Sequence, residues 1–140
     1  MKNRAYRLTI AVIACLILIT TMSCSEESEK HPDPLIGFIS QSGYVTNDIT
    51  IATLDTIKVG IKAAYNGFDR LTNFIAKKNG ERFADLGFYK EEYTWELDIV
   101  KGIEEKEEWE FIIRDYSGNM SSISLNIFKK DTLIAYNDIF

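Results

Sequence analysis

The stretch WEFIIRDYSGNMSSISLNIF, residues 109–128, carries the clearest structural pattern in the chain. Large apolar residues recur at every second position on both sides of its middle: Trp109, Phe111, Ile113, Ile123, Leu125 and Ile127. Successive side chains of a β-strand point to opposite faces, so this spacing predicts two strands that each bury one face. The residues DYSGN between them, 115–119, are typical of a tight turn. The stretch therefore predicts a β-hairpin.

The same alternation extends through most of the chain. It recurs in residues 56–63 and 93–100, and further candidate strands are residues 35–40, 49–54, 70–78 and 81–89. Asn79-Gly80 lies between two of these runs and is a strong hairpin signal. No segment shows a convincing helical stripe. About seven short strands in residues 35–130 predict an all-β fold, an antiparallel β-sandwich.

The hairpin resembles the last hairpin of bacterial immunoglobulin-like domains. In those domains an aromatic-x-apolar-x-apolar strand leads into Asp-x-x-Gly-Asn and a closing strand. Trp109 stands near the tyrosine-corner position, and Phe111 stands where immunoglobulins carry a cysteine. GYVTNDITIATLDTIKVGIKA, residues 43–63, also resembles the opening strands of such domains on lipoproteins of the Bacteroidota. The resemblance implies an immunoglobulin-like sandwich and says little about function.

The N-terminus has the pattern of a secretory signal. Three basic residues precede an apolar run from Leu8 to Met22. As a helix this run would span about 22 Å, against roughly 30 Å of hydrocarbon, so a signal peptide is favoured over a transmembrane anchor. We assign residues 1–23 to the signal peptide.

Cys24 follows Ser23 directly after this apolar run. The arrangement resembles the lipobox of bacterial lipoproteins, which implies cleavage before Cys24 and acylation of that residue. Two or three acyl chains on one cysteine hold a protein at a membrane durably. A rival lipobox ending at Cys15 would leave LILITTM on the mature chain and is rejected. An ordinary secreted protein with an incidental cysteine remains the alternative.

SEESEKHPDP, residues 25–34, contains four acids and no large apolar side chain, which predicts that residues 24–34 form a flexible acidic tether. Its acidic start resembles surface-export signals of Bacteroidota lipoproteins and implies the outer membrane, facing outward. Loss of Lys2, Arg4 and Arg7 with the signal peptide changes the net charge from −5 to −8. This charge disfavours nucleic acid as a partner. The mature chain keeps one cysteine and no disulfide, and residues 131–140 form a C-terminal extension.

Catalytic patterns are missing from the sequence. The only histidine, His31, falls in the tether, so a Ser-His-Asp group is not expected inside the domain. No zinc-ligand cluster or phosphate-binding glycine loop is present. Asp115 and Asn119 suggest calcium, but turn residues are the simpler interpretation. The acidic run 104–108 is interpreted as a solvated loop. We expect no catalytic residue, no metal and no cofactor.

Aromatic residues separate two hypotheses about ligands. Trp95 and Trp109 lie on apolar faces and are expected in the core, Trp109 near Ile61 and Leu125. Candidates for exposure near turns are Tyr44, Tyr65, Phe68, Phe88 and Tyr89.

The leading hypothesis is a non-catalytic, lipid-anchored surface module that acts by protein interaction or adhesion. The alternative is a glycan-binding lipoprotein of a polysaccharide-uptake system. A small hydrolase would need acids that converge in a cavity. A flat, exposed patch of two or more aromatics at one end of the sandwich would favour the glycan hypothesis.

Overall fold

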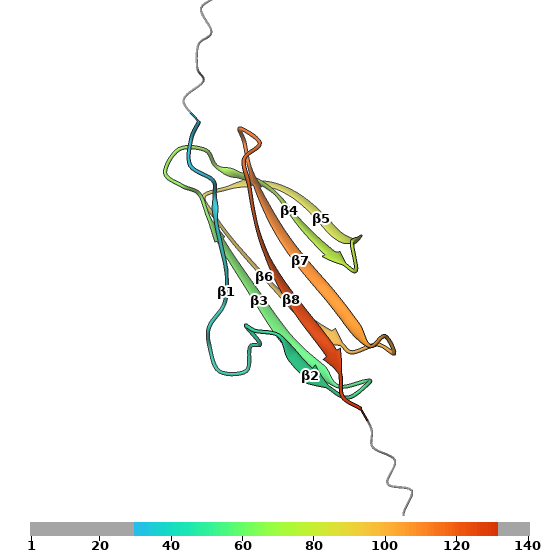
Figure 1. The fold of residues 1–140 in the computed structure, drawn as a ribbon. Helices are drawn as coiled ribbons and strands as arrows, with labels where there is room; N and C mark the ends of the chain where they lie inside the picture. Colours follow the sequence, from blue (N-terminus) through green and yellow to red (C-terminus); the bar gives the residue numbers. More distant parts are fainter. Residues whose placement is uncertain (1–29, 132–140) are drawn as a thin grey trace, which may run out of the picture. The chain divides into compact units, whose positions relative to one another are not determined.

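The computed structural model describes residues 30–131, which form two β-sheets and no helix (Figure 1). The eight strands are β1 (Leu35–Phe38), β2 (Ile49–Ile51), β3 (Thr56–Ala64), β4 (Leu71–Lys78), β5 (Glu81–Lys90), β6 (Glu92–Val100), β7 (Lys106–Asp115) and β8 (Met120–Lys129). The predicted signal peptide, Cys24 and residues 132–140 lie outside the described residues.

The strands form an immunoglobulin-like β-sandwich. One sheet has the order β1-β3-β6, and the other has the order β2-β8-β7-β4-β5. All pairs are antiparallel except β2–β8, which is parallel. The expectation of about seven antiparallel strands differs from this in detail. The chain between Leu35 and Ile51 changes sheets, so it supplies two short strands, and the second runs alongside β8.

The core is built largely from the apolar faces that the alternation predicted, and β4 adds Leu71, Phe74 and Ala76, whose faces were not predicted. It contains Ile57, Val59, Ile61, Ala63, Leu71, Phe74, Ala76, Ile99, Trp109, Phe111, Ile113, Leu125 and Ile127. Trp109 is 3% exposed and stands opposite Leu125 in the β7–β8 register. Trp95 is half-buried, and its ring centroid lies 5.0 Å from that of Phe74. Both tryptophans therefore face the core, as predicted.

Both predicted turns are present. Asn79 and Gly80 join β4 to β5 with φ of 51° and 81°, the positive values that a two-residue hairpin of this kind requires. In the β7–β8 turn, the buried Asp115 carboxylate accepts hydrogen bonds from the Asn119 backbone N–H (2.8 Å) and from Asn119 Nδ2 (2.9 Å). Both carboxylate oxygens thus serve the turn, which is the structural role that the turn interpretation gave to these residues.

The sandwich has two ends, each formed by a different set of loops. The entry end holds the start of the described chain, the β3–β4 loop, the turn at Glu91 and the β7–β8 turn (Figure 1). The far end holds the β2–β3 loop, the β4–β5 turn, the β6–β7 loop and the end of β8. The described chain enters at one end and leaves at the other (Figure 1).

Candidate functional site

Two loops are locked together at the far end. The backbone N–H of Leu54 donates to the carbonyl of Lys101 (2.9 Å), and the N–H of Lys101 donates to the carbonyl of Asp55 (2.8 Å). The Asp55 carboxylate also accepts from the backbone N–H of Ala52 (3.1 Å), which closes the β2–β3 loop on itself. These bonds fix the β2–β3 loop against the β6–β7 loop.

Exposed apolar side chains stand on these two loops and at the end of β6. Ile103 is 80% exposed and Leu54 is 77% exposed, and Val100 is exposed as well. We call Leu54, Val100 and Ile103 the far-end platform. Leu54 has φ of 73°, a left-handed conformation that is uncommon for a residue with a bulky side chain. Such a conformation costs on the order of 1–3 kcal/mol and persists only where the surroundings fix it.

A buried ion pair lies beneath the surface of the far end. Lys101 Nζ lies 3.2 Å from Glu107 Oε1, and both side chains are fully buried. Lys101 also donates to the carbonyls of Gly102 and Glu104. Glu107 Oε1 accepts the Gly102 N–H at 2.6 Å, and its Oε2 lies 3.3 Å from Lys78 Nζ. Burial opposes ionisation of Glu107, but the Gly102 hydrogen bond and the two lysines hold its pKa below the ordinary value.

The interpretation of residues 104–108 as a solvated loop is wrong for residues 106–108, which begin β7, and only Glu107 among them is buried. This residue belongs to β7 and shares the inward face with Trp109, and Lys101 supplies the opposite charge that its burial requires. Gly102 makes room for it, because a Cβ at that position would lie 2.7 Å from Glu107 Oε1. The two-residue spacing to Trp109 was the available signal in the sequence.

The entry end holds the only histidine, which the sequence placed in the tether. His31 Nδ1 lies 2.6 Å from Asp69 Oδ2, and the ring stacks on Phe68 with centroids 4.7 Å apart. Asn66 Nδ2 donates to the carbonyl of Pro32. Residues 31–32 therefore contact the β3–β4 loop. The loop supplies the Phe68 ring and the Asp69 carboxylate to His31, and the Asn66 amide to the Pro32 carbonyl.

This histidine does not complete a catalytic triad. The hydrogen bond from His31 holds the pKa of Asp69 below its ordinary value. In a triad the histidine is in the middle and takes the serine proton. Among the described residues, the hydrogen-bond partner of His31 is Asp69, and this bond fixes the approach of the chain to the domain.

Aromatic side chains gather on the surface of the entry end. Tyr116 is 73% exposed, Phe68 is 62% exposed and Tyr89 is 60% exposed. The rings of Tyr89 and Tyr116 have centroids 6.2 Å apart and planes at 83°. The Arg70 guanidinium lies over Tyr89 at 5.3 Å from the centroid and pairs with Glu91 at 2.7 Å.

The prediction of exposed aromatics was correct for only two residues. Phe68 and Tyr89 are exposed, whereas Tyr44, Tyr65 and Phe88 are half-buried. Phe88 stacks on Tyr93 at 4.3 Å between centroids, and Tyr44 packs over Gly60. Tyr116 was missed, although it occupies the solvent-facing tip of the predicted DYSGN turn.

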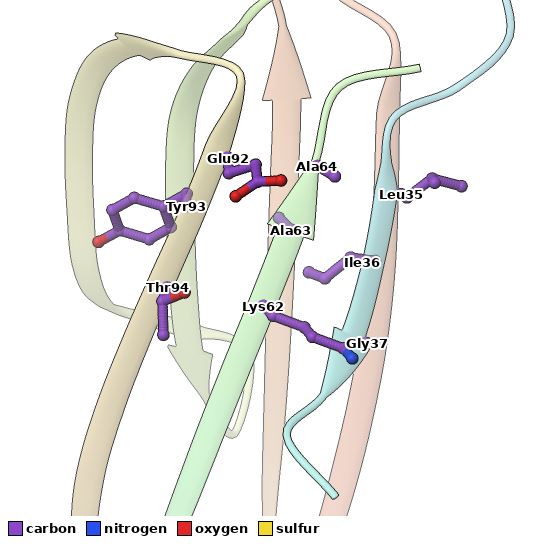
Figure 2. Close-up of a pocket in the computed structure, with 9 residues that line it drawn as sticks. All are labelled: Leu35, Ile36, Gly37, Lys62, Ala63, Ala64, Glu92, Tyr93 and Thr94. Atoms are coloured by element: carbon purple, nitrogen blue, oxygen red, sulfur yellow. The ribbon is translucent and has the colours of Figure 1, made fainter. Parts of the chain in front are cut away.

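A shallow hollow of about 440 Å³ lies on the three-stranded sheet near the entry end (Figure 2). Gly37 and Ala64 leave space on the sheet surface because their side chains are missing or small. Figure 2 shows Lys62 extending toward Gly37 and the Glu92 carboxylate pointing toward Ala64. The hollow thus offers one cation and one anion over a small-residue surface, and its lining supplies no imidazole or thiol.

Within residues 30–131, no three His, Cys, Asp or Glu side chains cluster in a way that could hold a metal ion. A helix able to span a membrane is likewise not found in the part of the chain that the structure describes.

Comparisons with known proteins give only general likenesses. No family model matches the chain, and no curated protein matches it. Fibronectin(III)-like modules of CbhA from Clostridium thermocellum are similar at 18% identity and a TM-score of 0.43, over 69% of this chain and 97% of that chain. An engineered protein is similar at 8% identity and a TM-score of 0.45, over 73% of this chain and 21% of that chain. A superoxide reductase (neelaredoxin) from Ignicoccus hospitalis is similar at 7% identity and a TM-score of 0.41, over 70% of this chain and 82% of that chain. The fold assignment rests on the strand order itself.

Proposed function

We propose that this protein is a non-catalytic module, anchored by acyl chains on Cys24 to the bacterial outer membrane and facing the exterior, that binds a protein partner. The observation that carries the proposal is the position of the far-end platform. The described chain begins at the entry end, close after Cys24, and Leu54 and Ile103 stand at the opposite end. An anchored domain would hold this platform away from the membrane, where a partner can reach it.

The construction of the platform supports a binding role. Its side chains are apolar and exposed, and its two loops are fixed to each other by backbone hydrogen bonds. Surfaces that are rigid before binding lose less conformational entropy on association. The left-handed Leu54 directs a large apolar side chain into solvent at a cost in backbone strain, which is a feature found at functional positions.

The glycan alternative finds less support in the geometry. Two exposed tyrosines do share the entry end, but their planes stand at 83° and so present no common flat face for stacking on a sugar. A glycan-array measurement with the wild type and with Tyr89→Ala tests this alternative. Binding that is lost in Tyr89→Ala would promote the glycan hypothesis over the protein one.

The anchor is tested with Cys24→Ser, with Cys15→Ser as the matched control. Metabolic labelling with a fatty acid should mark the wild type and Cys15→Ser, and Cys24→Ser should remain an unlabelled precursor. Labelling that follows Cys15, or equal labelling of all three proteins, would contradict the anchor.

The platform is tested by placing a photo-crosslinking amino acid at Ile103 in cells. The control position is Thr94, which is also exposed but lies on the three-stranded sheet. A discrete adduct is expected from position 103, weakened by Leu54→Asp and missing from position 94. The same adduct pattern from both positions, or none from position 103, would refute the platform as a binding surface.

A further inference from the structure

The exposed apolar residues of the entry end come from five separate parts of the chain. Phe68 lies in the β3–β4 loop, Tyr89 near the end of β5 and Tyr116 in the β7–β8 turn, while Leu35 and Met120 begin β1 and β8. All five are exposed. We call them the entry-end surface. They converge there because the sheet topology brings these strand ends to one end of the sandwich (Figure 1).

The chain length between Cys24 and this surface is short. Six residues separate Cys24 from His31, and a fully extended chain spans at most about 3.6 Å per residue. Cys24 therefore lies within about 25 Å of His31 in any conformation. His31 is itself held at the entry end by its stacking on Phe68 and its hydrogen bond to Asp69. Acyl chains on Cys24 would keep the entry end close to the membrane.

The side chains of the entry-end surface suit a lipid headgroup layer. Tyrosine places an apolar ring and a hydroxyl across the boundary between hydrocarbon and water, and aromatic residues are enriched there. Arg70 stacks on Tyr89 and is paired with Glu91, so this cation and anion offset each other beside the rings. The 83° angle between the two tyrosines, which disfavours sugar stacking, does not hinder contact with disordered lipid.

We infer that the entry-end surface rests on the lipid headgroups of the membrane that carries the anchor, and so holds the sandwich upright with its far end outward. This inference rests on the proposed acylation of Cys24. A short tether gives the surface a high effective concentration at the membrane, so that contacts too weak to hold a free protein there become populated. The surface acts as an orienting contact, and the acyl chains supply the attachment.

The test compares two single-cysteine variants of the full chain, Tyr116→Cys at the entry end and Ile103→Cys at the far end. Acylation consumes the Cys24 thiol and cleavage removes Cys15, so only the new cysteine takes an environment-sensitive dye. Each labelled protein is reconstituted into phosphatidylcholine vesicles that contain a lipid with a quencher on its headgroup. Strand β7 has ten residues and spans about 33 Å, which separates the two positions well.

Quenching several-fold stronger at position 116 than at position 103 is expected. The double variant Leu35→Ser/Tyr89→Ser should reduce quenching at position 116 while its melting temperature stays close to that of the wild type, since both side chains are exposed and Phe68, which holds His31, stays in place. Equal quenching at both positions, in protein whose mass shows the acyl groups, would overturn the upright orientation and leave the anchor intact. A mass without acyl groups would overturn the anchor, and this inference with it.

Discussion

Replacement of Glu107 by glutamine should destabilise the domain strongly, although the side chain keeps its size. The amide oxygen can still accept the Gly102 N–H, but the negative charge that balances Lys101 and Lys78 is lost. Lys101 then remains a fully buried cation whose partners among the described residues are carbonyl oxygens. Removal of one member of a buried ion pair typically costs about 3–5 kcal/mol.

The lower end of that range applies here. The carbonyls of Gly102 and Glu104 continue to accept hydrogen bonds from Lys101, which limits the cost to about 3 kcal/mol. With a urea dependence of roughly 1.5 kcal/mol per molar, the unfolding midpoint should fall by about 2 M. In the double variant Lys101→Met/Glu107→Gln the buried charge is gone, so at least half of the lost stability should return.

The pH dependence supplies an independent check. Because the pKa of Glu107 is lowered in the folded state, the ion pair contributes its full stability above the carboxyl pKa of the unfolded chain, about 4.3. That contribution disappears as the pH falls through the folded-state pKa. The glutamine variant should lack this part of the acid-induced loss.

Urea unfolding followed by tryptophan fluorescence measures both effects. Glu105→Gln is the matched control, because Glu105 lies in the β6–β7 loop just before β7 and pairs with Lys129 on the surface, and it should unfold like the wild type. A midpoint for Glu107→Gln that coincides with that of Glu105→Gln would refute the structural role of the buried pair.

Three further substitutions test the core, a close contact and a turn. Trp109→Ala should lower the free energy of unfolding by about 3–5 kcal/mol in urea. Trp109→Phe should lower it less, because the indole Nε1 has no hydrogen-bond partner among the described residues. A wild-type midpoint for Trp109→Ala would place the ring outside the core. Gly60→Val should lower the melting temperature, because a Cβ there would lie 2.8 Å from the Tyr44 ring; Gly37→Ala, with open space around it, is the control and should melt like the wild type. Asp115→Ala should cost about 1–3 kcal/mol by removing both hydrogen bonds to Asn119, and unchanged calorimetric stability would contradict the role of the carboxylate in the turn.

Local patterns in the sequence predicted most of the sandwich. The alternation through Trp109 and Leu125 identified both strands and their buried faces, since burial of one face fixes the register of a strand. Asn79-Gly80 and DYSGN predicted their turns because each has a residue that accepts the required backbone conformation. These features depend on neighbours within a few residues, and so they can be read without the fold.

Features that depend on distant residues were not predictable in the same way. The contact of His31 with Asp69, the parallel pairing of β2 with β8 and the gathering of Tyr89 and Tyr116 each join segments that the sequence keeps apart. The burial of Glu107 is intermediate between these cases. Its spacing to Trp109 indicated an inward side chain, but the lysine that makes this burial tolerable is positioned by the fold of the β6–β7 loop.

The two ends of the described chain lie at opposite ends of the sandwich, and this placement determines how the domain would respond to tension. A pull between the entry end and the end of β8 runs along the strand axes (Figure 1). Beside the last strand, β2 pairs in parallel with β8 over Ile49 to Ile51, and β7 pairs with β8 along nearly its whole length. Force along the strands loads these hydrogen bonds in shear, so that many must break together, whereas a pull across a hairpin would open them one at a time. A domain threaded in this direction is suited to resist a load applied between its two ends.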